Sequence, residues 1–216
     1  MRWLLPTATC IVALLLPVGT AEAATRLKEE IFHTKLFADT VAVTRGSLQG
    51  GKGIPEGIQP FDEPAISGGL ADLQKMRNKA GEVVGFGIQL EVWTPDETGK
   101  PKPRFETSWT IVLPGRGTLF LHQVEDPSTL FGKIKAARSG PQPWHGVIDE
   151  RTTVGPGPGG VGIIVGGTGE FEGQRGTFIE TNQFTDLDSR TASAGGATSA
   201  TAGAVGSTTI TLRYSE

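Results

Sequence analysis

The sequence predicts an all-β protein, a closed barrel or a sandwich of short antiparallel strands. Glycine and proline supply 31 and 14 of the 216 residues, more than is typical of a helical protein. Beyond the N-terminal segment, no stretch sustains a helical period. Instead, about seven or eight short β-rich segments follow one another, separated by turn residues. That number of short strands favours a barrel or a sandwich.

Residues 1–23 have the pattern of a secretory signal. Arg2 supplies the positive charge, the apolar core runs from Cys10 to Leu16, and Ala21-Glu22-Ala23 fits the small-x-small cleavage rule. The alternative is an uncleaved membrane anchor. With cleavage, we expect a secreted or periplasmic protein without a membrane attachment. The mature chain, residues 24–216, then contains no cysteine and is held by packing alone.

Composition argues against several function classes. The charges nearly cancel, with 20 Lys and Arg against 23 Asp and Glu, which does not favour nucleic-acid binding. The single cysteine argues against a disulfide scaffold or a cysteine-based metal site. The three histidines show no ligand spacing, and no GxSxG sequence is present. We therefore expect neither a metal site nor covalent hydrolase chemistry.

The first strands are expected at residues 31–36 and 40–44. The best helical candidate follows at residues 69–79, where Leu70, Leu73 and Met76 recur at three-residue steps. Strands at 83–93, 105–113 and 118–124 come next, joined by short turns, so they form an antiparallel meander. The last strands are expected at 161–165, 174–184 and 208–214. These elements form one domain, with loop-rich segments at 45–64, 128–158 and 190–207.

Three carboxylates lie within or beside the meander strands: Glu91, Glu106 and Glu125. Strand carboxylates ordinarily face water. Alternatively, one of them projects into a barrel and acts as a base with a raised pKa. Because side chains alternate between the two faces of a strand, either face can be the inner one, and the sequence leaves this choice open.

The most specific string in the chain is GGTGEFEGQRG, residues 166–176. Its glycines allow one strand to turn sharply into the next, and its phenylalanine is suited to plug the base of a barrel. The string resembles the signature of the allene oxide cyclase and dirigent protein superfamily. The motif residues are Gly166, Gly167, Gly169, Phe171, Gly173 and Gly176. Upstream, Ala71-Asp72-Leu73 and Asn78-Lys79 extend the resemblance, which covers roughly residues 69–181.

The resemblance implies an eight-stranded antiparallel β-barrel of the allene oxide cyclase/dirigent-like type, forming a homotrimer. It also implies a small, mostly apolar ligand and isomerase or cyclase chemistry without a cofactor. Asn78 matches the family asparagine that helps to hold a catalytic water, and Gln89 stands where the family has cysteine. Both are therefore catalytic candidates. The alternative role for Asn78 is that of a turn residue before Gly81.

We therefore expect an exported barrel that binds a small apolar molecule and steers its isomerisation or cyclisation. Its interior would be lined by Trp93, Trp109, Phe120 and His122 as substrate-binding residues. Two alternatives remain: a non-catalytic binding or structural barrel, and a dirigent-like guide of radical coupling. A partly polar cavity of roughly 300 Å³ or more favours ligand chemistry, whereas a filled interior favours the non-catalytic barrel.

Overall fold

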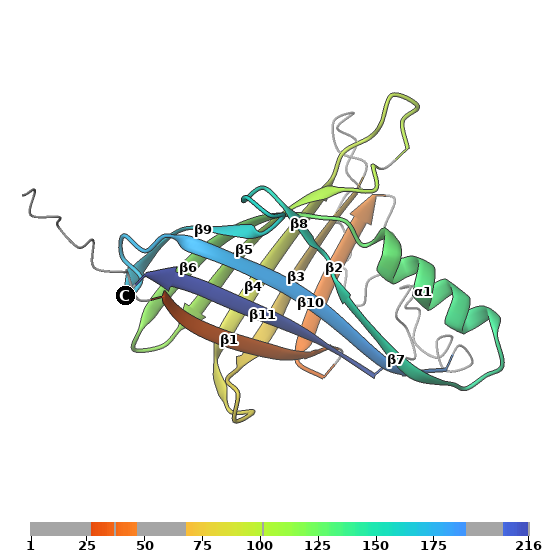
Figure 1. The fold of residues 1–216 in the computed structure, drawn as a ribbon, viewed down its shortest axis with the longest axis horizontal. Coiled ribbons are helices and arrows are strands. Elements are labelled where there is room, and N and C mark those ends of the chain that lie inside the picture. The colour runs from red at the N-terminus through yellow and green to blue at the C-terminus, as the bar shows by residue number, and fades with distance from the viewer. Residues whose placement is uncertain (1–26, 37, 47–67, 101, 189–204, 216) are drawn as a thin grey trace, which may run out of the picture.

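The computed structural model describes residues 27–36, 38–46, 68–100, 102–188 and 205–215 (Figure 1). The expected signal, residues 1–23, and most of the expected loop segments 45–64 and 190–207 lie outside these residues. The described elements are β1 (Leu27–Leu36), β2 (Thr40–Gly46), β3 (Gly68–Arg77), β4 (Val83–Trp93), β5 (Phe105–Leu113), β6 (Gly117–Glu125), α1 (Ser128–Ser139), β7 (Trp144–Arg151), β8 (Thr153–Gly155), β9 (Gly162–Gly169), β10 (Gly176–Leu187) and β11 (Val205–Ser215).

The strands close into an eight-stranded antiparallel barrel in the order β1-β11-β10-β9-β6-β5-β4-β3, which confirms the predicted fold class. The ring closes where His33 of β1 lies opposite Arg77 of β3. β2 then continues along the same edge of β3, with Thr40 opposite Gln74. Because β1 and β2 follow one another on this edge, together they act as one long bent strand.

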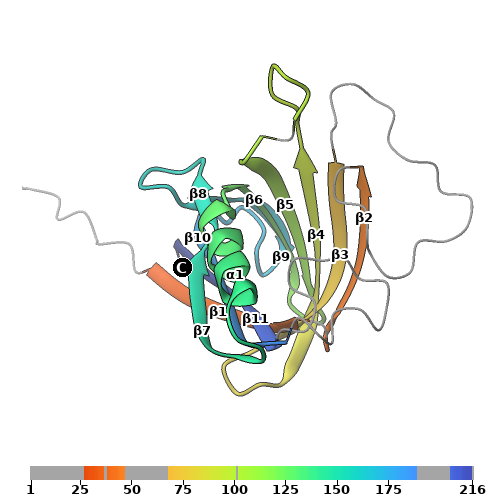
Figure 2. The same ribbon diagram turned by 90° about the vertical axis from the view of Figure 1, so that its right-hand side faces the viewer.

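β7 and β8 lie off the ring and extend its wall past the end of β9. β7 pairs with the second half of β10, and β8 pairs with the last residues of β6. α1 lies against β7 (Figure 2). Its buried face, Leu130, Ile134 and Ala137, packs in one apolar cluster with Ile148, Phe184 and Leu187.

Two expectations from the sequence differ from the structure. Residues 69–79 are not a helix but belong to β3, which pairs with β2 on one edge and β4 on the other. In β3 the side chains alternate, so Met76 is buried while Leu73 is exposed. Segment 128–158, expected to be loop-rich, carries α1, β7 and β8. The i, i+4, i+7 spacing of the buried residues of α1 is the helical signal in that segment.

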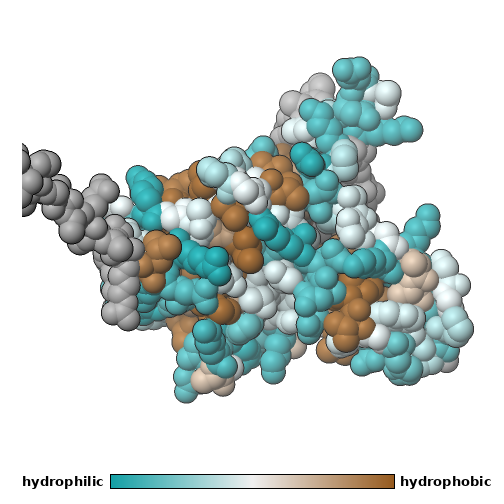
Figure 3. Space-filling model, viewed as in Figure 1, coloured by the Kyte–Doolittle hydropathy of each residue, from teal (hydrophilic) through white to brown (hydrophobic). Residues whose placement is uncertain are grey.

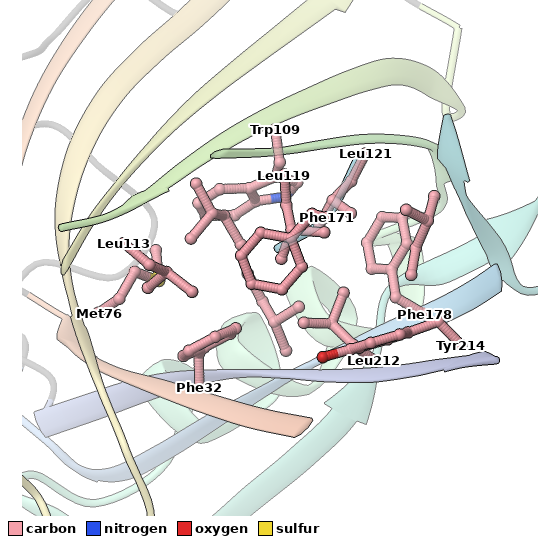
Figure 4. Packing of buried hydrophobic residues seen from close by; sticks show 13 residues of the cluster. Phe32, Met76, Trp109, Leu113, Leu119, Leu121, Phe171, Phe178, Leu212 and Tyr214 are labelled. Atoms are coloured by element: carbon pink, nitrogen blue, oxygen red, sulfur yellow. The ribbon is translucent and has the colours of Figure 1, made fainter. Parts of the chain in front are cut away.

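The glycine-rich motif closes the base of the barrel, where Phe171 lies within the apolar core as expected (Figure 4). The Phe171 ring meets Tyr214 edge-on, with 6.3 Å between ring centroids. The Arg116 guanidinium lies 5.1 Å from the centroid of the Phe171 ring and pairs with Glu30 and Glu170. The Tyr214 hydroxyl donates a 2.8 Å hydrogen bond to Glu30. These contacts join β1, β11 and two turns at the base.

Gly169 of the motif permits a close approach to the carbonyl oxygen of Arg116 in a turn, and Gly167 and Gly176 permit similar approaches to neighbouring strands. A Cβ atom on Gly167 would lie 2.6 Å from the carbonyl oxygen of Thr118, and one on Gly176 would lie 2.2 Å from that of Arg213. Both oxygens belong to neighbouring backbone, which cannot shift without moving a strand. Gly166 differs, because its added Cβ would meet only the Arg175 guanidinium, at an ordinary 3.5 Å.

We expect Gly176→Ala to lower the free energy of unfolding by about 1–3 kcal/mol, because the new methyl group would displace β11. Gly166→Ala is the matched control and should change the stability by less than about 0.5 kcal/mol. Urea unfolding of both variants, followed by circular dichroism, measures the difference. Equal stabilities for the two variants would contradict the packing role of Gly176.

Candidate functional site

Eight inward-facing polar residues form a buried belt across the barrel interior. Four strands each contribute one carboxyl and one carboxamide group, two residues apart, so that both face inward. All eight side chains are buried. These residues, called the polar belt below, are Asp72 and Gln74 of β3, Gln89 and Glu91 of β4, Gln123 and Glu125 of β6, and Glu180 and Asn182 of β10.

The carboxamides of the polar belt donate hydrogen bonds to the carboxyl groups. Gln89 Nε2 lies 2.9 Å from Glu91 Oε1 and 3.3 Å from Glu125 Oε1, and so joins β4 to β6. Gln123 Nε2 lies 2.7 Å from Glu125 Oε1 and 2.6 Å from Glu180 Oε2, and so joins β6 to β10. The belt is therefore one connected network.

Three further side chains extend this network. The indole Nε1 of Trp109 donates to Glu180 Oε2 at 3.2 Å. The Thr153 hydroxyl donates to Gln123 Oε1 at 2.6 Å, and the Thr208 hydroxyl donates to Asn182 Oδ1 at 2.7 Å. Because both oxygens of Glu180 accept hydrogen bonds, this carboxyl group is held in a fixed orientation.

The environment of the belt favours the protonated form of its carboxyl groups. Burial, reinforced by the charge of Glu180, raises the pKa of Asp72 to about 7. Burial and the neighbouring carboxylates raise the pKa of Glu91 and of Glu125 well above the usual range, and burial raises that of Glu180. Among the residues whose burial the structure describes, no lysine, arginine or histidine is buried. The belt can therefore hold exchangeable protons near neutral pH.

Apolar layers lie on both sides of the polar belt. Toward the base are Met76, Leu113, Leu119 and Phe171 (Figure 4). Toward the opposite end, where the β4–β5 hairpin begins, the rings of Trp93 and Phe105 stack at 4.0 Å with a 32° tilt. The belt thus lies between an apolar floor and an aromatic pair.

Two surface hollows formed by described residues lie away from the polar belt. One, of about 590 Å³, lies beside the β4–β5 hairpin at Pro95, Asp96, Glu97, Thr98 and Lys102. The other, of about 230 Å³, lies beside α1 at Phe131 and Arg138. The interior side chains meanwhile pack against one another. Neither of these two hollows is the interior cavity that ligand chemistry calls for.

The structure brings three of the predicted site residues into the barrel interior. Gln89 is part of the polar belt, Trp109 donates to it, and Trp93 belongs to the aromatic pair. Asn78 lies outside, in the turn after β3. Its Oδ1 accepts from the backbone N–H groups of Ala80 and Glu82, each at 3.0 Å. Asn78 thus occupies the turn that its alternative role describes, apart from Gln89.

Phe120 and His122 face outward, so the prediction that they line the interior is wrong. The Phe120 side chain is 38% exposed. The His122 Nε2 atom lies 3.2 Å from Glu106 Oε2 on the outer face of the barrel. The reason is the alternation of β6, which places Leu121 and Gln123 inward instead. The structure also shows which of the three strand carboxylates, Glu91, Glu106 and Glu125, face the interior.

Of those carboxylates, Glu91 and Glu125 face inward and Glu106 faces outward. Asp72 and Glu180, the other two carboxyl groups of the polar belt, are not among the site residues predicted from the sequence. The carboxamide partners Gln74, Gln123 and Asn182 are not among them either. A signal for them exists, because each of four strands carries an acid and an amide two residues apart.

Among the described residues, no group of three or more His, Cys, Asp or Glu side chains is arranged to hold a metal ion. No described helix has the length and apolar character needed to cross a membrane.

No protein-family model and no curated protein matches the chain. Solved structures resemble its fold. One is described as a nonspecific heme-binding cyclase that catalyses a 4 + 2 cycloaddition during neoabyssomicin biosynthesis, at 9% identity over 89% of this chain and 69% of that chain, with a TM-score of 0.42. Another is the Diels-Alderase AbmU from Streptomyces koyangensis, at 8% identity over 89% and 70% of the two chains, with a TM-score of 0.39. Membership of the allene oxide cyclase or dirigent families stays a prediction.

The raised pKa values of the belt predict that the protein loses stability as the pH rises. The folded state keeps protons that the unfolded chain releases above its ordinary carboxyl pKa values. The favourable contribution is therefore complete at about pH 4 and is lost as the pH rises through the folded pKa, about 7 for Asp72. At about 1.4 kcal/mol per pKa unit, Asp72 alone accounts for roughly 4 kcal/mol.

Urea unfolding at about pH 4.5, 6 and 8 measures this dependence. Asp72→Asn should flatten it, because the variant has no proton to lose at this position. Glu172→Gln changes an exposed carboxyl group in the same chemical way and should leave the slope unchanged. A wild-type stability that rises between pH 5 and 8 would show that the belt carboxyl groups are ionised in the folded state.

Proposed function

We propose that the protein is a small-molecule-binding barrel that acts as a cofactor-free isomerase or cyclase, with the polar belt as its acid–base centre. The observation that carries this proposal is the burial of four carboxyl groups between apolar layers, without a buried base among the described residues. Burying such groups costs stability. Carboxyl groups with strongly shifted pKa values in an enclosed setting are typical of catalytic sites.

The chemistry needs only proton transfer and positioning. A protonated belt carboxyl group donates its proton to the reacting group of the ligand, and an ionised one stabilises the positive charge that develops. When the new bond has formed, a proton returns from the product to the belt. No electrons are gained or lost, so no oxidant is required. The apolar layers exclude water and hold the ligand in one conformation.

The runner-up is a non-catalytic barrel that serves as an exported binding or structural protein. The tightly clustered apolar core and the position of both surface hollows away from the belt favour this candidate. The two functions differ in whether a molecule ever occupies the polar belt, which can be measured directly. For either function, the signal pattern of residues 1–23 supports export as a proposal.

Native mass spectrometry of the protein purified from the cells that produce it tests the proposed function. We expect a complex heavier than the mature chain by one small molecule, which denaturation releases. With the released compound or its precursor as substrate, Glu180→Gln should lower turnover by about 100-fold or more, since it removes a proton-transferring group. Glu172→Gln is the control. A bare chain whose Trp fluorescence no candidate ligand alters would favour the non-catalytic barrel.

We further propose that the protein self-associates, as the implied trimer requires, through the wall formed by β3, β4 and β5. The centre of this wall carries outward apolar side chains that are about half exposed: Leu73, Phe86, Ile88, Leu90 and Val112. Polar outward side chains border them, Lys75 on β3 and Glu106, Ser108 and Thr110 on β5. An exposed apolar surface that continues across neighbouring strands is typical of an interface. On the face seen in Figure 3, by contrast, hydrophilic residues separate the hydrophobic patches.

The double substitution Ile88→Lys with Leu90→Lys should reduce the particle mass toward that of a monomer, because two charges cannot be buried in an apolar interface. Val147→Lys, at an exposed apolar position on β7, is the control and should leave the mass unchanged. Size-exclusion chromatography with light scattering measures the mass. A monomeric wild-type protein at micromolar concentration would exclude this interface.

A further inference from the structure

The carboxamide groups of the polar belt have no free N–H group to offer a ligand at its β3 end. Gln74 Nε2 donates to Asp72 Oδ2 at 2.9 Å and to Gln89 Oε1 at 3.3 Å. Gln89 Nε2 in turn donates to Glu91 and Glu125. A carboxamide nitrogen has two hydrogens, so both donors are used at each of these residues.

What remains without a partner at this end is a pair of acceptors. Asp72 Oδ1 and Gln74 Oε1 are buried and have no hydrogen-bond partner. The side chains are only 8% and 1% exposed, respectively. They belong to residues two apart on β3, and the bond between Gln74 Nε2 and Asp72 Oδ2 keeps their head groups together. Leaving buried acceptors unpaired is costly, so a complementary ligand brings hydrogen-bond donors.

The charges of the side chains around Asp72 indicate which class of ligand fits this site. The charged groups that interact with Asp72 are Glu91 of β4 and Glu180 of β10, and Glu125 of β6 lies next to Glu91, so all of them are acidic. No basic side chain of the described chain is buried beside them. A donor that also carries a positive charge therefore suits this site better than a neutral hydroxyl or amide.

We infer that the polar belt binds an ammonium group, held by Asp72 Oδ1 and Gln74 Oε1, so that the ligand is an apolar primary or secondary amine. This inference rests on the proposed function, because it names the ligand class of the same interior site. The apolar body of the amine extends from there toward the aromatic pair of Trp93 and Phe105.

Binding of the ammonium group is linked to protons. A carboxylate, not a carboxylic acid, pairs with the cation, so binding ionises Asp72 and releases its proton. Affinity then rises from pH 5.5 to pH 8, over which simple amines stay fully charged. A neutral ligand held by a protonated carboxyl group would show the opposite dependence.

Isothermal titration calorimetry of the full chain tests the inference with two matched probe pairs. These are benzylammonium against benzyl alcohol, and cyclohexylammonium against cyclohexanol. We expect each ammonium ion to bind at least about tenfold more tightly than its alcohol. Titration in two buffers of different ionisation enthalpy should show proton release near pH 7. Asp72→Asn should weaken ammonium binding by about tenfold or more, whereas Glu106→Gln, an outward strand carboxyl group, should not change it.

Several results would overturn the inference. If an alcohol binds as tightly as its ammonium partner, or if affinity falls as the pH rises, the ligand is neutral and the proposed function survives without the amine. If Ca²⁺ or Mg²⁺ stabilises the protein in an Asp72-dependent manner and the ammonium ions do not, the site binds a metal. If no probe binds and native mass spectrometry shows a bare chain, the proposed function fails as well. The wild-type probe pairs decide the question even if Asp72→Asn does not fold.

Discussion

Closure of the sheet gives every strand a single inner face, and eight strands must fill the enclosed space together. The closure itself rests on a short contact, since β1 and β3 meet at the pair His33 and Arg77. Arg77 strengthens this seam by donating two hydrogen bonds, at 2.7 and 2.9 Å, to the carboxylate of Asp39 just after β1. Without the closed ring, the polar belt would face water and its carboxyl groups would be ordinary ones.

The chain therefore keeps two kinds of acidic group in opposite states. The Arg77 guanidinium beside Asp39 lowers the pKa of that carboxyl group to about 2, so the seam stays charged in mild acid. Hydrogen bonding to Arg116 likewise lowers the pKa of Glu30 at the base, against the effect of burial. Burial away from any base raises the pKa of Asp72 to about 7. Arginine-paired acids hold the wall and base together, and unpaired acids occupy the interior.

The alternation of the central strands could be predicted from the sequence, but not which face is inner. In β4 the inner face carries Gly87, Gln89 and Glu91, and the outer face carries Phe86, Ile88 and Leu90, the reverse of the usual rule. The inner face can be this poor in apolar groups because Trp109 and Met76 from neighbouring strands fill the space over Gly87. This filling depends on side chains from other strands, so the periodicity of β4 alone does not predict which of its faces is the inner one. In β6, likewise, the apolar Phe120 lies on the outer face and the polar Gln123 on the inner face.

The structure at the base of the barrel could be predicted from the sequence more readily than the polar belt. The glycines and Phe171 of residues 166–176 act locally, through turns and close backbone contacts, and a short string can encode them. The polar belt is encoded differently, as an acid and an amide repeated on four strands that are up to about a hundred residues apart in the chain. Each pair alone resembles a solvent-exposed strand segment, and only closure of the ring brings the pairs together.

The composition of the belt bears on the choice between a catalytic and a purely structural barrel. A barrel selected for stability alone gains from apolar side chains at inward positions, since exchanging buried ionisable groups for hydrophobic ones is often stabilising. The base of this barrel follows that rule, with Met76 of β3, Leu119 of β6 and Phe178 of β10 fully buried. One layer away, the same strands carry carboxyl groups with raised pKa values and acceptors that lack partners. Because both layers share the same strands, the difference cannot come from topology. The polar composition of the belt therefore favours a barrel whose interior binds a ligand.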